Sequence, residues 1–465
     1  MYIFDKYKKL KGDNKTIILN IIFTLLIKGG SLVLALFTLP AYMQYFDNKV
    51  ILGVWLTIVA FLNWILLFDL GIGNGLRNKL VKPLIEGNMG LVKSYISSAY
   101  ISLSFISIVV SVVVYKIIDM VNWNAFFGVD SNYISNDIFI EAIRIVLLGT
   151  LIQFVLRIIT SILYAMQKSF VPNLLQLSST LLLIIYIYLG LYLGASSLSP
   201  EENLIHLAYA NILTVNLPLF VVTLVIFQTS LKGCFPKFKR FEKKYAQDIM
   251  KLGIAFLWLQ IVYMIITNTN EFFITWLIGA ESVVEYQVYY KLFTLSGTLM
   301  AIALTPIWSA VTKAKAEHNY IWIQKLNKIL MCLGALGVLF SFLMIPFLQS
   351  IINLWLGDNS IKVNYTYSVI FAISGGIFLW NRIISTMCNG FGELKVQMIF
   401  LTFGAVVNFP LAYFLAATFE SYIAIVMANI VSMLPYCIVQ PIWMNKLLKQ
   451  KEIKNKKSVI AETLL

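Results

Sequence analysis

The strongest constraint on this chain is a series of long apolar runs that repeats along its 465 residues. Each run has about 20 residues, the length that an α-helix needs to cross the hydrocarbon layer of a bilayer. The runs predict membrane spans over residues 17–41, 50–70, 94–118, 138–164, 170–193, 204–227, 252–275, 284–310, 326–348, 365–388, 395–417 and 421–443. We therefore expect an all-α integral membrane protein of about twelve transmembrane helices.

Composition supports this interpretation. Only 12% of the residues are charged and 59% are hydrophobic, whereas about a quarter of the residues of a soluble domain are charged. The apolar stretch after the basic N-terminus is too long for a cleavable signal peptide. The four cysteines have no metal-type spacing, so we expect packing residues and no metal site: Cys234, Cys332, Cys388 and Cys437.

The basic residues predict the orientation in the membrane. With the N-terminus inside, the outer loops hold Lys49, Lys116 and Lys362, and most of the other lysines and arginines outside the spans face the cytoplasm. Positive charge is retained on the cytoplasmic side of membrane proteins. We therefore expect a multi-pass membrane protein with both termini in the cytoplasm. The net charge of +14 then reports orientation, and we expect no nucleic-acid partner.

The longest inner loop, residues 232–251, divides the predicted spans into two groups of six. We expect an N-terminal lobe over 1–231, a basic cytoplasmic linker over 232–251, a C-terminal lobe over 252–445 and a basic cytoplasmic tail over 446–465. A short internal match supports a duplication, since Arg157-Ile-Ile-Thr-Ser resembles Arg382-Ile-Ile-Ser-Thr. Two parallel repeats of this kind often enclose a substrate site in transporters.

Five basic residues lie inside the predicted spans: Lys28, Arg144, Arg157, Lys291 and Arg382. A charge at this depth costs about 2.5–3.5 kcal/mol and normally faces a bundle interior or a watery cavity. Except for Arg144, each lies on a helical face with other polar residues. The pattern predicts a central cavity between the lobes with Lys28, Arg157, Lys291 and Arg382 as its cations.

Other roles for these residues stay open at this point. An ion pair that fixes helix packing would also explain each of the four cations. Arg144 lies on a different face from Arg157, and we expect it to pair with an acid near the outer surface or to reach the interface. Asp69 and Glu271 are candidates for binding a coupling H⁺ or Na⁺, and a helix-end or salt-bridge role is the alternative.

The most distinctive motif is FDLGIGNGLRNKL at residues 68–80. Its glycines do not indicate a dinucleotide loop, because a membrane helix and not a strand precedes them. Gly71, Gly73 and Gly75 instead predict a tight exit from the membrane after Asp69. We expect Arg77 and Lys79 to lie in the lipid phosphate layer.

With this motif, the chain resembles the Wzx-type flippases, which are polysaccharide transporters of the multidrug/oligosaccharidyl-lipid/polysaccharide exporter superfamily. Further segments carry the resemblance over most of the chain: 278–281 with Tyr286 and 291–293, 306–310 with Trp322, 354–357, and 389–392. Glu271 departs from the family pattern, because relatives often carry aspartate near this position.

The resemblance implies a flippase that moves undecaprenyl-pyrophosphate-linked oligosaccharide repeat units to the outer leaflet by alternating access. Such units serve the synthesis of O-antigen or capsule, and a polysaccharide polymerase and a chain-length regulator are candidate partners. Membrane lipid is a further expected partner. Because the sequence has no enzymatic motif, we expect no enzymatic activity and no cofactor apart from a coupling H⁺ or Na⁺. The resemblance also implies a location in the bacterial inner membrane.

Three other functions are weighed against this one. A drug exporter of the same superfamily usually carries cations and should have an acidic cavity. A lipid II flippase usually has two more spans than this chain provides. A membrane enzyme of polysaccharide assembly usually has a large outer loop or a cluster of catalytic acids, and the longest outer loop here, 119–137, is short.

Overall fold

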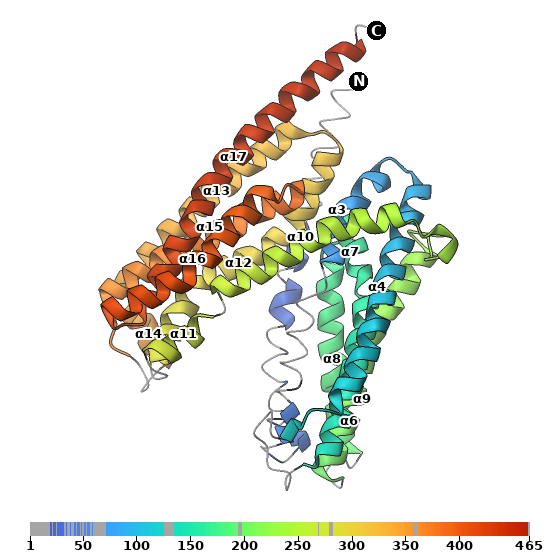
Figure 1. The fold of residues 1–465 in the computed structure, drawn as a ribbon, viewed down its shortest axis with the longest axis vertical. Helices are drawn as coiled ribbons and strands as arrows, with labels where there is room; N and C mark the ends of the chain where they lie inside the picture. The colour runs from blue at the N-terminus through green and yellow to red at the C-terminus, as the bar shows by residue number, and fades with distance from the viewer. Residues whose placement is uncertain are drawn as a thin grey trace. The chain divides into compact units, whose positions relative to one another are not determined.

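The computed structural model describes residues 71–124, 134–193, 198–267, 269–278, 282–356 and 361–463, together with scattered positions between 19 and 58. These residues form helices joined by short loops, and they contain no strand (Figure 1). The chain divides into two compact units, Met1–Ile254 and Ala255–Leu465. The boundary between the units lies inside helix α10 (Lys243–Thr267).

Unit 1 contains scattered helical positions from 19 to 58 and then a series of defined helices. These are α3 (Ile72–Ile85), α4 (Met89–Ile118), α6 (Asn136–Leu156), α7 (Ile158–Ala165), α8 (Val171–Tyr192), α9 (Pro200–Gln228) and the short 3₁₀ helix η2 (Phe238–Arg240). Helix α9 packs on α6 and α8, and α3 packs on α4 and α7. The core contains large buried side chains such as Trp55, Phe46 and Phe139.

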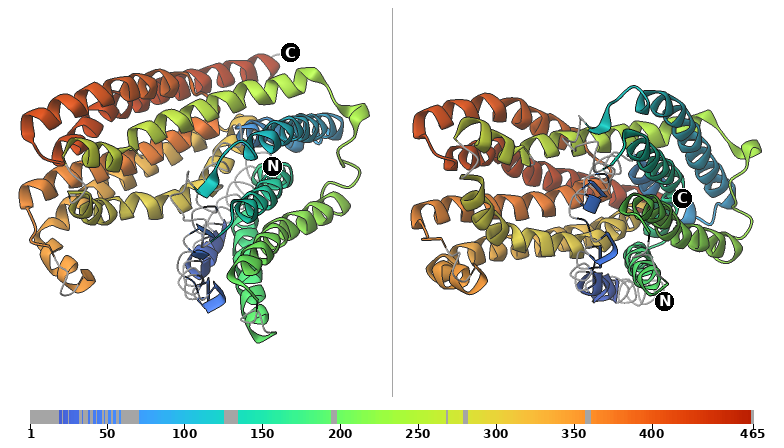
Figure 2. Two further views of the ribbon diagram at one scale, coloured as in Figure 1. Left: turned by 60° about the horizontal axis from the view of Figure 1, so that its bottom comes forward. Right: turned by 90° about the horizontal axis from the view of Figure 1, so that it is seen from below.

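Unit 2 contains the rest of α10 and the helices that follow it. These are α11 (Asn270–Leu277), α12 (Ser282–Ala316), α13 (Tyr320–Leu343), η3 (Ile345–Phe347), α14 (Leu348–Leu356), α15 (Tyr365–Phe391), α16 (Lys395–Phe419) and α17 (Ile423–Thr463). Helix α15 packs on α12, α13 and α17, and α16 lies beside α17 (Figure 2). The core of unit 2 includes Tyr289 and Phe371, whose rings are stacked with their centroids 5.1 Å apart.

Ten helices among the described residues are long and apolar enough to cross a membrane. They correspond in order to the ten predicted spans from 94–118 to 421–443, which confirms the expected all-α membrane fold. The first two predicted spans, 17–41 and 50–70, fall largely outside the described residues, and a shorter apolar helix, Ile22–Ser31, lies within the first. About twelve spans is therefore consistent with the structure, and the division into six and six stays a prediction.

Capping side chains explain where several of the helices begin. Asn88, Ser135, Asn319 and Asn364 each accept a hydrogen bond from the first turn of the helix that follows. Ser199 and Glu202 form a full capping box at the start of α9. These side chains satisfy backbone N–H groups that have no partner within the helix.

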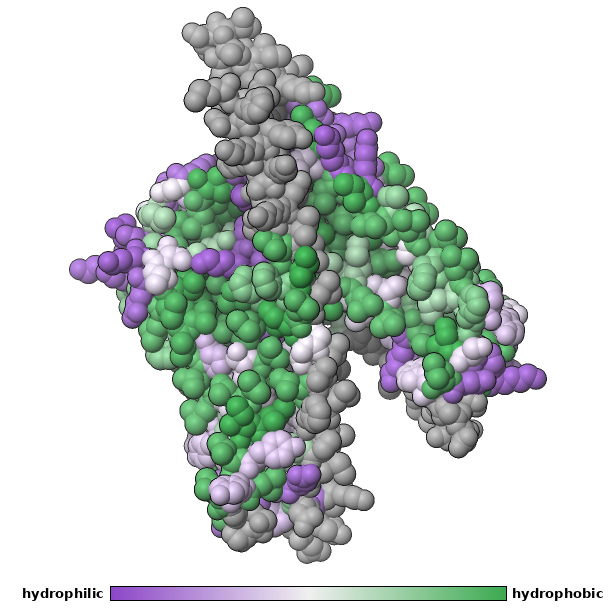
Figure 3. Space-filling view, turned by 180° about the vertical axis from the view of Figure 1, so that it is seen from behind, coloured by the Kyte–Doolittle hydropathy of each residue, from purple (hydrophilic) through white to green (hydrophobic). Residues whose placement is uncertain are grey.

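The exposed surface of the long helices is largely apolar, as contact with lipid requires. Large apolar side chains are exposed along the long helices, for example Phe105 in α4, Leu213 in α9 and Val406 in α16. Figure 3 shows hydrophobic residues over broad areas of one face, with hydrophilic residues in smaller groups. Exposed apolar area of this extent marks contact with a membrane or a partner, and the helix lengths favour a membrane.

Candidate functional site

Unit 1 contains a cavity of about 760 Å³ whose lining is mainly amides, hydroxyls and two cations. The N-terminal helical residues and α6 to α9 contribute to it. Its polar lining consists of Lys28, Thr38, Tyr42, Thr150, Gln153, Arg157, Thr160, Tyr164, Asn173, Gln176, Ser179, Thr180 and Asn211. No aspartate or glutamate is present among the lining residues that the structure describes. The cavity is therefore cationic.

Lys28 projects to this cavity from the predicted first span. Its Nζ donates a hydrogen bond of 2.7 Å to Oε1 of Gln176 in α8. No carboxylate among the described residues forms an ion pair with it. The neutral amide leaves the charge of Lys28 uncompensated, so the ion-pair alternative does not hold for Lys28 within the described part of the chain.

Arg157 lies within the fourth predicted span, at the junction of α6 and α7. The helix is interrupted at this residue, between α6 and α7, and the Thr160 hydroxyl donates a hydrogen bond of 2.8 Å to the Arg157 carbonyl. The side chain is exposed and lines the cavity. Helical spacing places Gln153, Ser161 and Tyr164 on the same face as Arg157, and Gln153 and Tyr164 line the cavity as well. Ser161 is buried and is not among the described lining residues, and the cationic site as a whole stays a prediction.

Arg77 reinforces the positive charge from behind the cavity wall. Its guanidinium lies 4.4 Å from the ring centroid of Tyr164, and the residue is 3% exposed. The expectation that Arg77 lies in the lipid phosphate layer is therefore wrong. The arginine packs instead on an aromatic face of the kind that attracts cations.

The glycines of the motif serve a turn and a close helix contact. Gly71 precedes α3 with φ of 65°, a left-handed conformation that favours glycine. A Cβ at Gly71 would lie 1.8 Å from the carbonyl oxygen of Gly253 in α10, and one at Gly75 would lie 2.4 Å from that of Ile249. Gly73 is buried in the first turn of α3. Asp69, a candidate for ion coupling, lies outside the described residues.

In unit 2, Arg382 lies between two aromatic rings. Its guanidinium carbon is 5.3 Å from the centroid of Tyr263 and 4.9 Å from that of Phe378. No carboxylate in the described part of the chain forms an ion pair with it. Lys291 is exposed on α12, and the side chain of Glu271 is outside the description. The structure thus brings Lys28 and Arg157 to one cavity, and the grouping of all four cations stays a prediction.

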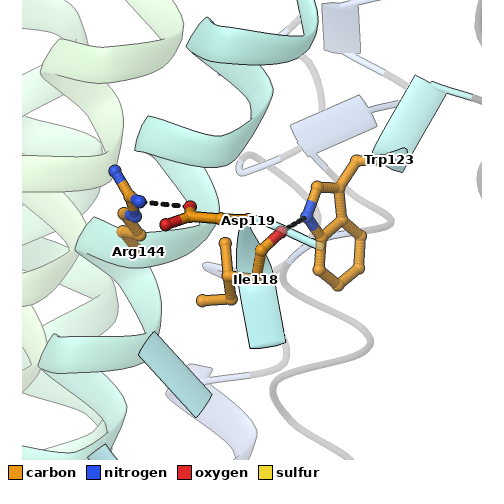
Figure 4. Close-up of polar contacts among 4 residues, drawn as sticks. All are labelled: Ile118, Asp119, Trp123 and Arg144. Carbon is orange, nitrogen blue, oxygen red and sulfur yellow. Dashed lines mark hydrogen bonds and ion pairs between the residues drawn. The ribbon is translucent and has the colours of Figure 1, made fainter. Parts of the chain in front are cut away.

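Arg144 has the alternative role expected for it. Its guanidinium forms an ion pair with Asp119 at the end of α4, next to Trp123, whose indole donates to the Ile118 carbonyl (Figure 4). The guanidinium also lies 4.7 Å from the ring centroid of Tyr115. The prediction that Arg144 pairs with an acid is confirmed.

The sequence interpretation missed the contribution of α8 to the cavity. Asn173, Gln176 and Thr180 recur at helical spacing on one face of α8, and Ser179 lies beside them. This face is visible in the sequence from its spacing alone, although it carries no charged residue. An uncharged polar face inside a membrane span points to a cavity as well, because lipid offers no hydrogen bonds.

Comparison with known proteins identifies the fold. No family model matches the chain, and no curated protein sequence matches it. Solved structures do match over nearly its full length. A MATE transporter in complex with MaD5 has a TM-score of 0.70 at 15% identity, covering 95% of this chain and 97% of that one.

Two other neighbours give the same result. A MATE transporter of Vibrio cholerae in the bent form has a TM-score of 0.68 at 11% identity, over 94% of this chain and 99% of that one. A superfamily transporter of Pyrococcus furiosus has a TM-score of 0.69 at 14% identity, over 95% and 97% of the two chains. The reversed polarity of its binding pocket suggests a different function for that protein. The chain therefore has the fold of the MATE transporters of the multidrug/oligosaccharidyl-lipid/polysaccharide exporter superfamily.

Proposed function

We propose that this protein is a flippase that moves an anionic lipid-linked oligosaccharide, of the undecaprenyl-pyrophosphate type, from the cytoplasmic to the outer leaflet. The observation that carries the proposal is the cationic cavity of unit 1, with Lys28 and Arg157 and without a carboxylate among its described lining residues. The polar head would pass through the protein by alternating access while the polyprenyl tail stays in the bilayer.

The charge of the cavity favours a phosphate-bearing head group. The planar guanidinium of Arg157 can bind two phosphate oxygens at once, and Lys28 supplies a compact second charge. The low dielectric of the membrane strengthens both attractions relative to water. Removing the neutral partner Gln176 from Lys28 costs less free energy than breaking an ion pair would. A pyrophosphate can therefore displace Gln176 from Lys28.

The rest of the lining suits a sugar. Asn173, Ser179, Thr180 and Asn211 offer donors and acceptors for sugar hydroxyls, and Tyr42 offers an aromatic surface. The volume of about 760 Å³ lies within the usual range for small-molecule sites. Coupling to H⁺ or Na⁺ stays a proposal for Asp69 and Glu271.

A drug exporter is the second candidate, and the fold supports it, because a solved neighbour is described as a multidrug resistance MATE family transporter. Lys28 and Arg157 would repel a cationic drug from the cavity of unit 1. The transporter of Pyrococcus furiosus supplies a precedent for this fold with a binding pocket of reversed polarity. The two functions differ in the charge of the substrate, so an experiment can separate them.

The test is deletion of the gene in its host, followed by rescue with variants. We expect loss of surface polysaccharide and accumulation of a lipid-linked repeat unit on the cytoplasmic leaflet. The intact gene should rescue export, and Arg157→Gln and Lys28→Gln should reduce it strongly, because each removes a charge from the cavity. Lys82→Gln is the matched control, since Lys82 pairs with Glu86 outside the cavity.

Two results would contradict the proposal. The first is normal export in Arg157→Gln, Lys28→Gln and the double variant at wild-type protein levels. The second is unchanged surface polysaccharide in the deletion strain together with new sensitivity to cationic compounds. That second result would favour the drug exporter.

A further inference from the structure

Helix α17 carries an uncharged polar face that runs through the interior of unit 2. Asn429, Ser432, Tyr436 and Gln440 recur at spacings of three and four residues, so they lie on one side of the helix. Ser432, Tyr436 and Gln440 are at most 2% exposed. A polar group at this depth is costly unless it is hydrogen-bonded, because lipid cannot serve as a partner.

Protein groups satisfy the first part of this face. Asn429 donates to Oδ1 of Asn270 at 2.8 Å and accepts from Asn408 at 2.7 Å, and Asn270 donates to the Tyr286 hydroxyl at 2.9 Å. Asn270 and Asn429 also line a cavity of about 30 Å³ with Thr294. A cavity of this size with several polar partners can hold about two water molecules.

Protein groups satisfy the second part only partly. The Tyr436 and Ser385 hydroxyls are 3.0 Å apart, and Gln397 donates to Ser385 at 3.2 Å. Within the described residues, no partner exists for Gln397 Oε1, Asn381 Nδ2 or either amide atom of Gln440. Gln397, Asn381 and Gln440 are at most 4% exposed. A buried amide without a partner is destabilising, so this group requires a ligand that the protein itself does not supply.

We propose that unit 2 binds internal water along this face of α17, from the cavity at Asn429 to Gln440. Water fits the unpaired atoms because it both donates and accepts, and Gln440 presents one unpaired donor and one unpaired acceptor. A cation would satisfy only the oxygens and would leave the amide N–H groups of Asn381 and Gln440 unpaired. The site is separate from the cationic cavity of unit 1 and does not rest on the proposed function.

Radiolytic hydroxyl labelling of the full-length protein in nanodiscs tests this proposal, because radicals formed from bound water oxidise the side chains that touch it. Tyr436 and Tyr289 form a matched pair, since both are 0% exposed. The Tyr289 hydroxyl accepts from the Asn364 N–H at 2.8 Å, and its ring stacks within the aromatic core. We expect Tyr436 to be oxidised several-fold faster than Tyr289. Equal rates would overturn the proposal.

Substitution of the buried amides tests whether they bind the water. Gln440→Met keeps the length of the side chain and removes both polar atoms, so the oxidation of Tyr436 should fall towards the rate of Tyr289. Gln397→Met is a second variant with the same expectation, should the first not fold. Unchanged oxidation of Tyr436 in a folded variant would show that the amides hold no water.

Discussion

Position 71 requires glycine for two reasons, the backbone conformation and the close approach of another helix. Its φ of 65° is a conformation that L-residues with a side chain rarely adopt, and its Cα faces the backbone of Gly253 in α10. Glycine-rich motifs in membrane proteins often allow backbones to approach in this way. The sequence predicts the turn but not the contact, because nothing local in residues 68–80 identifies the helix that will pack there.

A pair of alanine variants separates the two requirements. Gly87 has a φ of 67°, and a Cβ added there would meet no atom within 4 Å, so Gly87→Ala should lose only about 1–2 kcal/mol for the left-handed conformation. Gly71→Ala should lose about 1–3 kcal/mol more from the clash with Gly253. Thermal unfolding of the purified protein measures both. Equal losses would show that α10 moves away at no cost.

The cations show how far a residue can be predicted from its neighbours. Helical spacing places Arg157 on a polar face with Gln153 and Tyr164, and all three side chains line the cavity of unit 1. Spacing cannot place Arg77, because its partner Tyr164 is far away in the sequence. A cation outside a span was expected to meet lipid phosphate, and a cation–π contact inside the unit prevails instead.

At the scale of elements, apolar length predicts the helices well and their interruptions poorly. The predicted span 252–275 is two helices, α10 and α11. Where they meet, the hydroxyls of Thr267 and Thr269 donate to the backbone carbonyls of Tyr263 and Ile265, one turn earlier. The predicted span 326–348 continues through η3 at Pro346 into α14. A hydropathy pattern averages over such local features.

Helix α17 shows how an element tolerates proline inside a membrane. Pro441 has no N–H, so the Cys437 carbonyl one turn earlier loses its usual helical partner. The indole N–H of Trp380 in α15 donates to this carbonyl at 3.2 Å. The neighbouring helix thus supplies the hydrogen bond that the proline removes.

We expect Trp380→Phe to destabilise the protein, by about 1 kcal/mol or more, because the buried Cys437 carbonyl then has no donor. In a Pro441→Ala background the restored N–H can bond that carbonyl, so the same change should cost less. Thermal unfolding of the four proteins gives the coupling energy. A coupling of zero would show that Trp380 stabilises the unit by packing alone.

At the scale of the molecule, charge predicts an orientation that neither fold nor packing reveals. The loop from 229 to 242 and the end of α17 are rich in lysine and arginine, whereas the first turn of α9 carries Glu201 and Glu202. The division into two compact units gives no information on orientation, because the boundary between the units lies inside helix α10 and not in a loop on one side of the membrane. The orientation therefore rests on the distribution of basic residues alone.

Reporter fusions test this orientation directly. Alkaline phosphatase is active only outside the cytoplasm, and green fluorescent protein fluoresces only when it folds inside. We expect a phosphatase inserted at Ser199, before α9, to be active, and one inserted at Lys232, after α9, to be inactive. Fluorescent protein fused after Leu465 should fluoresce, because we expect the basic tail to keep the C-terminus in the cytoplasm. The two phosphatase sites flank a single span, so each serves as the control for the other. An active phosphatase at Lys232 together with a non-fluorescent C-terminal fusion would show the opposite orientation. The proposed substrate would then have to enter the cavity from the opposite leaflet.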